Sequence, residues 1–134
     1  MVSISFSDTQ PLSLTPAKVV RYLEIYFMPT LNWRPHITTL ANRTRSMVKA
    51  LGVLGNLMQG LSCMAWRHIF SSIILPILTY GSNVWFTDVN QKSYLQVLQV
   101  AQNEACQKLT GVFQTTLTHL IQKLLAIPPI CFRL

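Results

Sequence analysis

The stretch SIILPILTYGSNVW, residues Ser72–Trp85, decides how the rest of the chain is interpreted. It is strongly apolar, it has a proline near its middle, and it ends in a glycine and a tryptophan. From His68 to Phe86, nineteen residues pass without Asp, Glu, Lys or Arg, and a membrane-spanning helix needs about 20 apolar residues. Several polar or helix-bending residues interrupt the run, however, so we expect a buried helix with a bend at Pro76. A small membrane protein stays as an alternative.

Upstream of this stretch, the sequence predicts a lead-in, one strand and an amphipathic helix. Residues 1–18 carry turn signals and are expected to be an irregular or extended lead-in. Val19–Phe27 is rich in β-branched and aromatic residues and predicts a strand, so that residues 19–33 form a strand and a turn. A helix is predicted from His36 to Leu51, ending near the glycines of GVLGN (52–56). Its expected inward positions are Ile37, Leu40, Ala41, Thr44, Met47, Val48 and Leu51.

Downstream, three further helices are predicted. Ser62 is expected to cap a helix that reaches about Tyr80, with Gly81 at its C-terminal end. Asn90 is expected to cap the next helix, Gln91–Leu109, which Gly111 ends. Thr115 or Thr116 opens the last helix, which runs to about Ala126. The expected inward residues are Leu95, Leu98, Gln102, Ala105 and Leu109, and then Leu117, Leu120, Ile121, Leu124 and Leu125. The predicted fold is therefore mainly α: a short N-terminal strand segment followed by four to five helices, with the helical region over residues 34–134.

The charge of the chain favours an anionic partner. Eleven Lys and Arg residues face four acids in 134 residues, which gives a net charge of +7. Such a chain attracts nucleic acid or anionic lipid, although positive charge can also serve solubility alone. The acids are scattered, as are the histidines, so we expect no catalytic site, no metal site and no cofactor in this chain. The three cysteines, Cys63, Cys106 and Cys131, form no CxxC pair and are expected to be buried, reduced thiols.

The predicted first helix has a basic side opposite its apolar stripe. At about 100° per residue, Asn42, Arg45 and Lys49 cluster together, with Arg43 beside them. Lys and Arg on a helix face bind phosphates without reading bases, but they also form ordinary solvated surfaces. Both interpretations stay open for Arg45 and Lys49. The N-terminus has no basic segment followed by a long apolar run, so we expect an intracellular protein, nuclear or cytoplasmic and not secreted.

Several phrases, taken in order, resemble one family. VRYLEIYFMPTLNWRPHI (20–37) is similar to a segment with the phrase YLG in non-LTR (LINE-like) retrotransposon reverse transcriptases. KALGVLGNLMQGLS (49–62) is similar to a connector in the fungal-type members. GLSCMAWRHIFSSIILPILTYGSNVW (60–85) resembles their LPxxxYG…W segment, and KLTGVFQTTLTHLIQKLLAIPPI (108–130) resembles a phrase that ends in GIPPI. The resemblance covers about residues 15–134.

The resemblance implies the thumb and connection region of an RNA-directed DNA polymerase, a helical bundle that cradles the RNA–DNA template–primer duplex. The palm, with its paired aspartates, and the fingers are absent from this chain, and the parent enzyme would use Mg²⁺. The implied partners are duplex or hybrid nucleic acid and the missing palm and fingers, without a membrane. By position, contact with the duplex would be made by Trp33, Arg34, His36, Asn42, Arg45 and Lys49.

Departures from the family phrases indicate a truncated, decayed fragment without polymerase activity of its own. Glu24 stands where YLG has glycine, Met28 where an aspartate is common, Cys63 where proline is common, and Gln114 where arginine is common. Glycine in YLG would permit an unusual φ or a close backbone approach. The alternative is a helical interaction module that associates with itself or a partner through apolar surface, without a nucleic-acid role.

Overall fold

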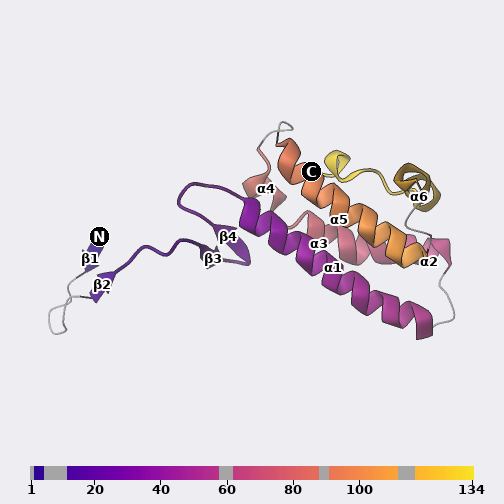
Figure 1. The fold of residues 1–134 in the computed structure, drawn as a ribbon, viewed down its shortest axis with the longest axis horizontal. Helices are drawn as coiled ribbons and strands as arrows, with labels where there is room; N and C mark the ends of the chain where they lie inside the picture. The colour runs from indigo at the N-terminus through magenta and orange to yellow at the C-terminus, as the bar shows by residue number, and fades with distance from the viewer. Residues whose placement is uncertain (1, 5–11, 58–61, 88–90, 112–116) are drawn as a thin grey trace. The chain divides into compact units, whose positions relative to one another are not determined.

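The computed structural model describes residues 2–4, 12–57, 62–87, 91–111 and 117–134. Figure 1 shows the described residues as mainly helical, with short strands near the N-terminus. This confirms the predicted fold class. The chain divides into two compact units, Met1–Trp33 and Arg34–Leu134, which are described separately below.

The first unit contains two antiparallel strand pairs. Strand β1 (Val2–Ile4) pairs with β2 (Leu12–Leu14), inside the segment expected to be irregular or extended. Strand β3 (Val20–Tyr22) pairs with β4 (Ile25–Phe27). The single strand predicted over 19–27 is therefore wrong: it is a hairpin.

The turn of this hairpin explains the difference. Leu23 and Glu24 have φ values of 48° and 64°, so both lie in the left-handed region. A two-residue hairpin turn with two positive φ angles normally takes Asn-Gly or Asp-Gly. Leu23-Glu24 lacks the Asn or Gly that marks such a turn, so the sequence pattern predicts one continuous strand instead of a hairpin. The unusual φ expected where the family phrase has glycine is present at Glu24.

The second unit begins with the long helix α1 (Arg34–Leu57). Its predicted apolar stripe is mostly buried: Ile37, Leu40, Ala41, Thr44 and Val48 are each at most 3% exposed, whereas Met47 is 36% exposed. The helix continues through the glycines at which a break was expected. A Cβ at Gly52 would meet nothing within 4 Å, so no close approach requires glycine there. A helix tolerates such a glycine at a cost of roughly 1 kcal/mol.

The stretch that opened the sequence analysis begins within a continuous rod, Cys63–Leu78, in which a π-helical segment lies between two α-helices. Helix α2 (Cys63–Ile69) begins at Ser62, whose hydroxyl accepts a hydrogen bond from the Ala65 amide, as predicted. A π-helical segment, Phe70–Ile74, follows and leads directly into α3 (Leu75–Leu78). Pro76 lies in the first turn after the π-helical segment. The helical irregularity that was expected at the proline is therefore this π-helical segment. Among the described residues, no helix is long and apolar enough to cross a membrane.

The C-terminal part consists of α4 (Ser82–Trp85), α5 (Lys92–Thr110), α6 (Thr118–Leu125) and a short 3-10 turn, Ile130–Phe132. Gly111 ends α5 with a φ of 67°, as predicted. Asn90, Gln114, Thr115 and Thr116 lie outside the described residues. On α6, Ile121 and Leu125 are buried, but Leu117, Leu120 and Leu124 are 60%, 49% and 69% exposed, so their predicted inward orientation is wrong.

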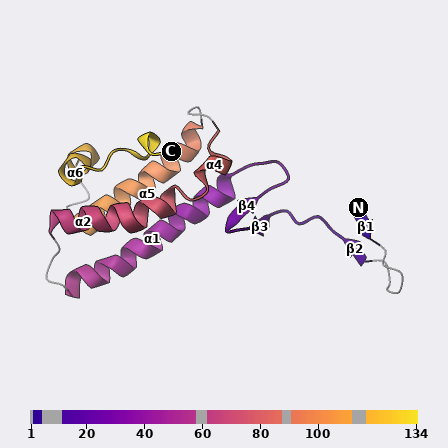
Figure 2. The same ribbon diagram turned by 180° about the vertical axis from the view of Figure 1, so that it is seen from behind.

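Three long rods pack around a common core in the second unit. Helices α1 and α5 lie side by side, and the α2–α3 rod lies against them, as the two opposite views show (Figures 1 and 2). Helix α6 packs against α2 and α5 near one end. The fully buried side chains of this core are Ile37, Leu40, Phe70, Ile74, Leu78, Trp85, Leu98 and Ile130.

Candidate nucleic-acid interface

The beginning of α1 is fixed by a buried polar cluster around the carbonyl of Tyr80. Gly81 has a φ of 67° and starts the turn after α3. This turn lets the Trp85 indole fold back, so that its Nε1 donates a hydrogen bond of 2.9 Å to the Tyr80 carbonyl. His36 Nε2 lies 3.3 Å from the same oxygen, with its ring 6.4 Å from that of Trp85. Tyr80, Gly81 and Trp85 belong to one family phrase, and His36 belongs to another. The fold brings the two phrases together in this cluster.

This position changes the interpretation of His36. The side chain is 0% exposed, so the cluster, rather than a bound duplex, is its environment. Burial, which disfavours the imidazolium, lowers the pKa of His36 below its ordinary value. The hydrogen bond to Tyr80 opposes this effect, and the nearby Arg43 adds a smaller lowering. The geometry thus gives His36 a neutral, structural place at the start of α1.

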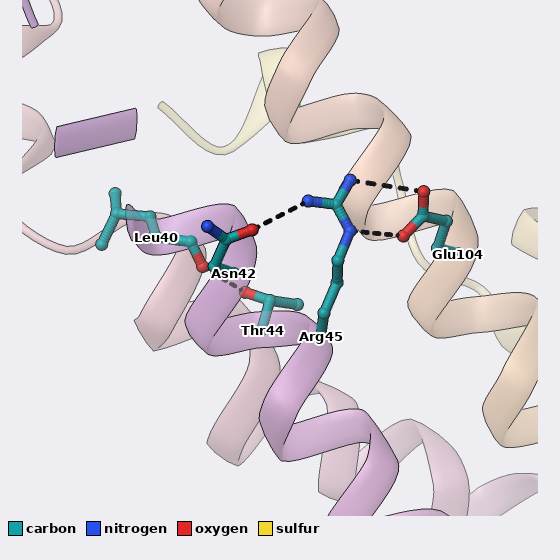
Figure 3. Close-up of polar contacts among 5 residues, drawn as sticks. All are labelled: Leu40, Asn42, Thr44, Arg45 and Glu104. Atoms are coloured by element: carbon teal, nitrogen blue, oxygen red, sulfur yellow. Dashed lines mark hydrogen bonds and ion pairs between the residues drawn. The ribbon is translucent and has the colours of Figure 1, made fainter. Parts of the chain in front are cut away.

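Arg45 lies on the predicted basic side of α1, where it pairs with Glu104 of α5 (Figure 3). Its Nε donates to Glu104 Oε2 at 2.7 Å, a second guanidinium nitrogen lies 3.3 Å from Oε1, and a third donates to Asn42 Oδ1 at 3.3 Å. The hydrogen bond with Arg45 lowers the pKa of Glu104, and the same bond raises the pKa of Arg45. Lys108, one turn further along α5, also lowers the pKa of Glu104. The sequence did not indicate this pair, because its members are 59 residues apart.

Two other candidates lie on the exposed surface of α1. Asn42 and Lys49 are exposed, one turn on either side of Arg45. A surface groove of about 530 Å³ begins beside them, lined by Asn42, Arg43, Met47 and Ile77 among others. The structure thus brings together Asn42, Arg45 and Lys49, as the helical periodicity predicted.

Trp33 and Arg34 lie on either side of the boundary between the two units. The half-buried Trp33 packs edge-on against Phe27, with ring centroids 5.4 Å apart, inside the first unit. Arg34 is exposed at the first position of α1. Phe27 is thus a packing partner of Trp33, which the resemblance placed among the residues that contact the duplex.

The thiols differ from the prediction. Cys106 is buried, and burial raises its pKa to about 12, but Cys63 and Cys131 are exposed. The expectation of three buried thiols is therefore wrong for two of them. Within the described ranges, no group of three or more His, Cys, Asp or Glu side chains is placed to hold a metal ion.

Comparison with known proteins gives one distant similarity. A 115 kDa protein of the type-1 retrotransposable element R1DM of Drosophila melanogaster is 27% identical over 110 residues. The match takes in 82% of this chain but 11% of that protein, so the chain spans about a tenth of the length of its relative. No family model and no solved structure matches. The similarity supports a retrotransposon-related origin.

Proposed function

We propose that this chain is a fragment of a retroelement RNA-directed DNA polymerase, from the thumb and connection region, which binds duplex or RNA–DNA hybrid nucleic acid weakly and without sequence preference. The observation that carries the proposal is the basic surface of α1, formed by Asn42, Arg45 and Lys49. Cations on one side of a helix suit phosphates, which repeat regularly along a duplex. The proposal assigns polymerase chemistry to the palm, so added Mg²⁺ is expected to give no primer extension by this chain.

The ion pair between Arg45 and Glu104 indicates which cation of the α1 surface is available for phosphate. A guanidinium bound to a carboxylate has to share or exchange that partner before it grips a phosphate. Lys49 is exposed on the same side of α1 and forms no ion pair with another described residue, so we assign it the larger share of the phosphate contact. Glu104 then acts against binding, both by occupying Arg45 and by repelling the phosphates.

The test is a titration against a fluorescently labelled RNA–DNA hybrid at several salt concentrations, followed by anisotropy. Lys49→Gln is expected to weaken binding and to lower the slope of log affinity against log salt by about 1. Glu104→Gln is expected to strengthen binding. Lys123→Gln on the exposed side of α6 is the matched control, because it removes the same charge elsewhere.

A double variant separates the two roles of Arg45. Arg45→Gln with Glu104→Gln removes one charge of each sign, so the net charge stays at its original value. Weaker binding than that of Glu104→Gln alone would assign a phosphate contact to Arg45. If Lys49→Gln and Lys123→Gln lower affinity equally, the α1 surface is not the binding site.

A second function is favoured by the exposed leucines of α6. Leu117, Leu120 and Leu124 leave an apolar stripe on the surface, and such stripes promote association. In this alternative the chain is an interaction module that associates with itself or with the rest of a polymerase. Sedimentation that depends on protein concentration, and that Leu120→Ser with Leu124→Ser abolishes, would favour it.

A further inference from the structure

A second basic site lies away from α1, where the α2 rod meets the C-terminal segment. A pocket of about 400 Å³ opens there. Its lining includes Arg67 and His68 of α2 together with Arg133, which lies 66 residues after Arg67 in the chain. The apolar part of the lining comes mainly from Met64, Phe70, Leu75 and Ile127.

No acidic side chain in the described part of the chain balances the charge of this pocket. Its lining contains two arginines and no acid. The two described acidic side chains are occupied elsewhere: Glu24 pairs with Arg21, and Glu104 pairs with Arg45. Arg67 and Arg133 thus line the pocket without an acidic side chain as partner, in contrast to Arg45, which is paired with Glu104.

The apolar residues of the lining limit which class of anionic ligand the pocket suits. Phe70 is 1% exposed and Ile127 is 8% exposed, so they form a fixed wall, whereas the exposed Met64 is a flexible, polarisable side chain at the surface. Ligand pockets typically combine such apolar walls with a few polar groups in volumes of about 300–1,000 Å³. A small inorganic anion would leave the apolar wall without a partner.

We propose that this pocket binds a nucleoside monophosphate unit, with the phosphate between Arg67 and Arg133 and the base against the apolar wall. Arginine forms bidentate hydrogen bonds with phosphate, and a nucleobase presents a flat apolar face. The same unit occurs as a free nucleotide and at the end of a single strand. The pocket shares no residue with the α1 surface, so this inference stands apart from the proposed duplex contact.

The experiment is a titration of the purified, isotope-labelled full chain with AMP, followed by NMR chemical shifts. AMP is expected to bind more tightly than adenosine, ribose 5-phosphate or inorganic phosphate, and to shift the resonances of Phe70 and Ile127. Arg67→Gln and Arg133→Gln are each expected to weaken AMP binding about tenfold or more. Both residues are exposed, so the variants should fold, which an unchanged amide spectrum would verify.

Lys123→Gln is the charge-matched control and should leave AMP binding unchanged. Equal binding of AMP and adenosine, or equal weakening by Arg67→Gln and Lys123→Gln, would overturn the inference. Inorganic phosphate that binds as tightly as AMP would overturn the role of the apolar wall. A 5′-phosphorylated tetranucleotide that binds more tightly than AMP would assign the site to a strand end, and equal binding would assign it to a free nucleotide.

Discussion

Two polar sites on the same helix differ in what surrounds them. Near the start of α1, His36 is buried with Trp85 against the Tyr80 carbonyl, whereas two and a half turns later Arg45 meets Glu104 at the surface. At the first site, the His36 and Trp85 side chains are both 0% exposed. The second has water as an alternative partner, since its two side chains are 37% and 36% exposed. Burial, rather than bond count, should therefore decide how much each site stabilises the fold.

The sharpest way to break this comparison is to remove the indole of the buried site. Trp85→Ala should lower the free energy of unfolding by about 3–5 kcal/mol, because it leaves a cavity in the core and removes the indole donor to the Tyr80 carbonyl. Denaturant unfolding measures the change. Trp66→Ala, at a half-buried tryptophan of α2, is the control and should cost clearly less. Equal losses would show that Trp85 has no special role.

The pH dependence of the free energy of unfolding tests the site around His36 without creating a cavity. The pKa of His36 in the folded state lies below the ordinary value of 6.5, so below that pH the unfolded chain binds a proton that the folded chain does not. The free energy of unfolding should therefore fall as pH decreases through 6.5 towards the folded pKa, by up to about 1.4 kcal/mol per pH unit.

His36→Gln keeps a donor near Tyr80 but does not titrate. This variant should flatten the pH profile. A slope that survives His36→Gln would assign the effect to another group.

The next prediction concerns two residues with positive φ angles, one beside the buried site and one far from it in sequence. Gly81, in the buried cluster, and Ala126, at the end of α6, have φ values of 67° and 51°. L-residues pay roughly 1 kcal/mol or more in this region. Gly81→Ala should therefore destabilise the second unit, and Ala126→Gly should stabilise it by up to about 1 kcal/mol. Ala50→Gly, at an exposed position inside α1, is the matched control and should cost about 0.5–1 kcal/mol.

The surface ion pair should give the smallest effect. Arg45→Gln, Glu104→Gln and the double variant together form a thermodynamic cycle for the pair. Pairs with this exposure typically contribute 0–1 kcal/mol, and salt weakens them. A coupling of several kcal/mol would mean that the site behaves as a buried one, and the comparison would fail.

The sequence predicted the features that depend on local pattern. Periodicity located the stripes of α1 and α5, Ser62 marked the start of α2, and Gly111 marked the end of α5. The sequence did not predict features that depend on contacts between distant elements or on an unusual backbone conformation. Glu104 as the partner of Arg45 and the burial of His36 both depend on how helices pack.

The same limit applies to turns that lack their usual residue. Glu24 and Ala126 occupy left-handed positions without glycine. Composition therefore gave no signal for the hairpin, whereas the end of α6 was predicted to within one residue. The family phrases YLG and GIPPI have glycine at these two places. The backbone therefore has the form that glycine would favour, which agrees with the resemblance.

The π-helical segment Phe70–Ile74 has a consequence for how this chain should be aligned with others. The Leu75 amide bonds to the Phe70 carbonyl, five residues back rather than four, so this turn holds one residue more than an α-turn. The side chains before it and after it are thus out of phase by one position, as if a residue had been inserted. Deleting Ser71 would restore a regular helix but rotate Phe70 and the residues upstream of it relative to Ile74 and Leu78. Relatives that lack the extra residue should therefore show a compensating gap in this segment.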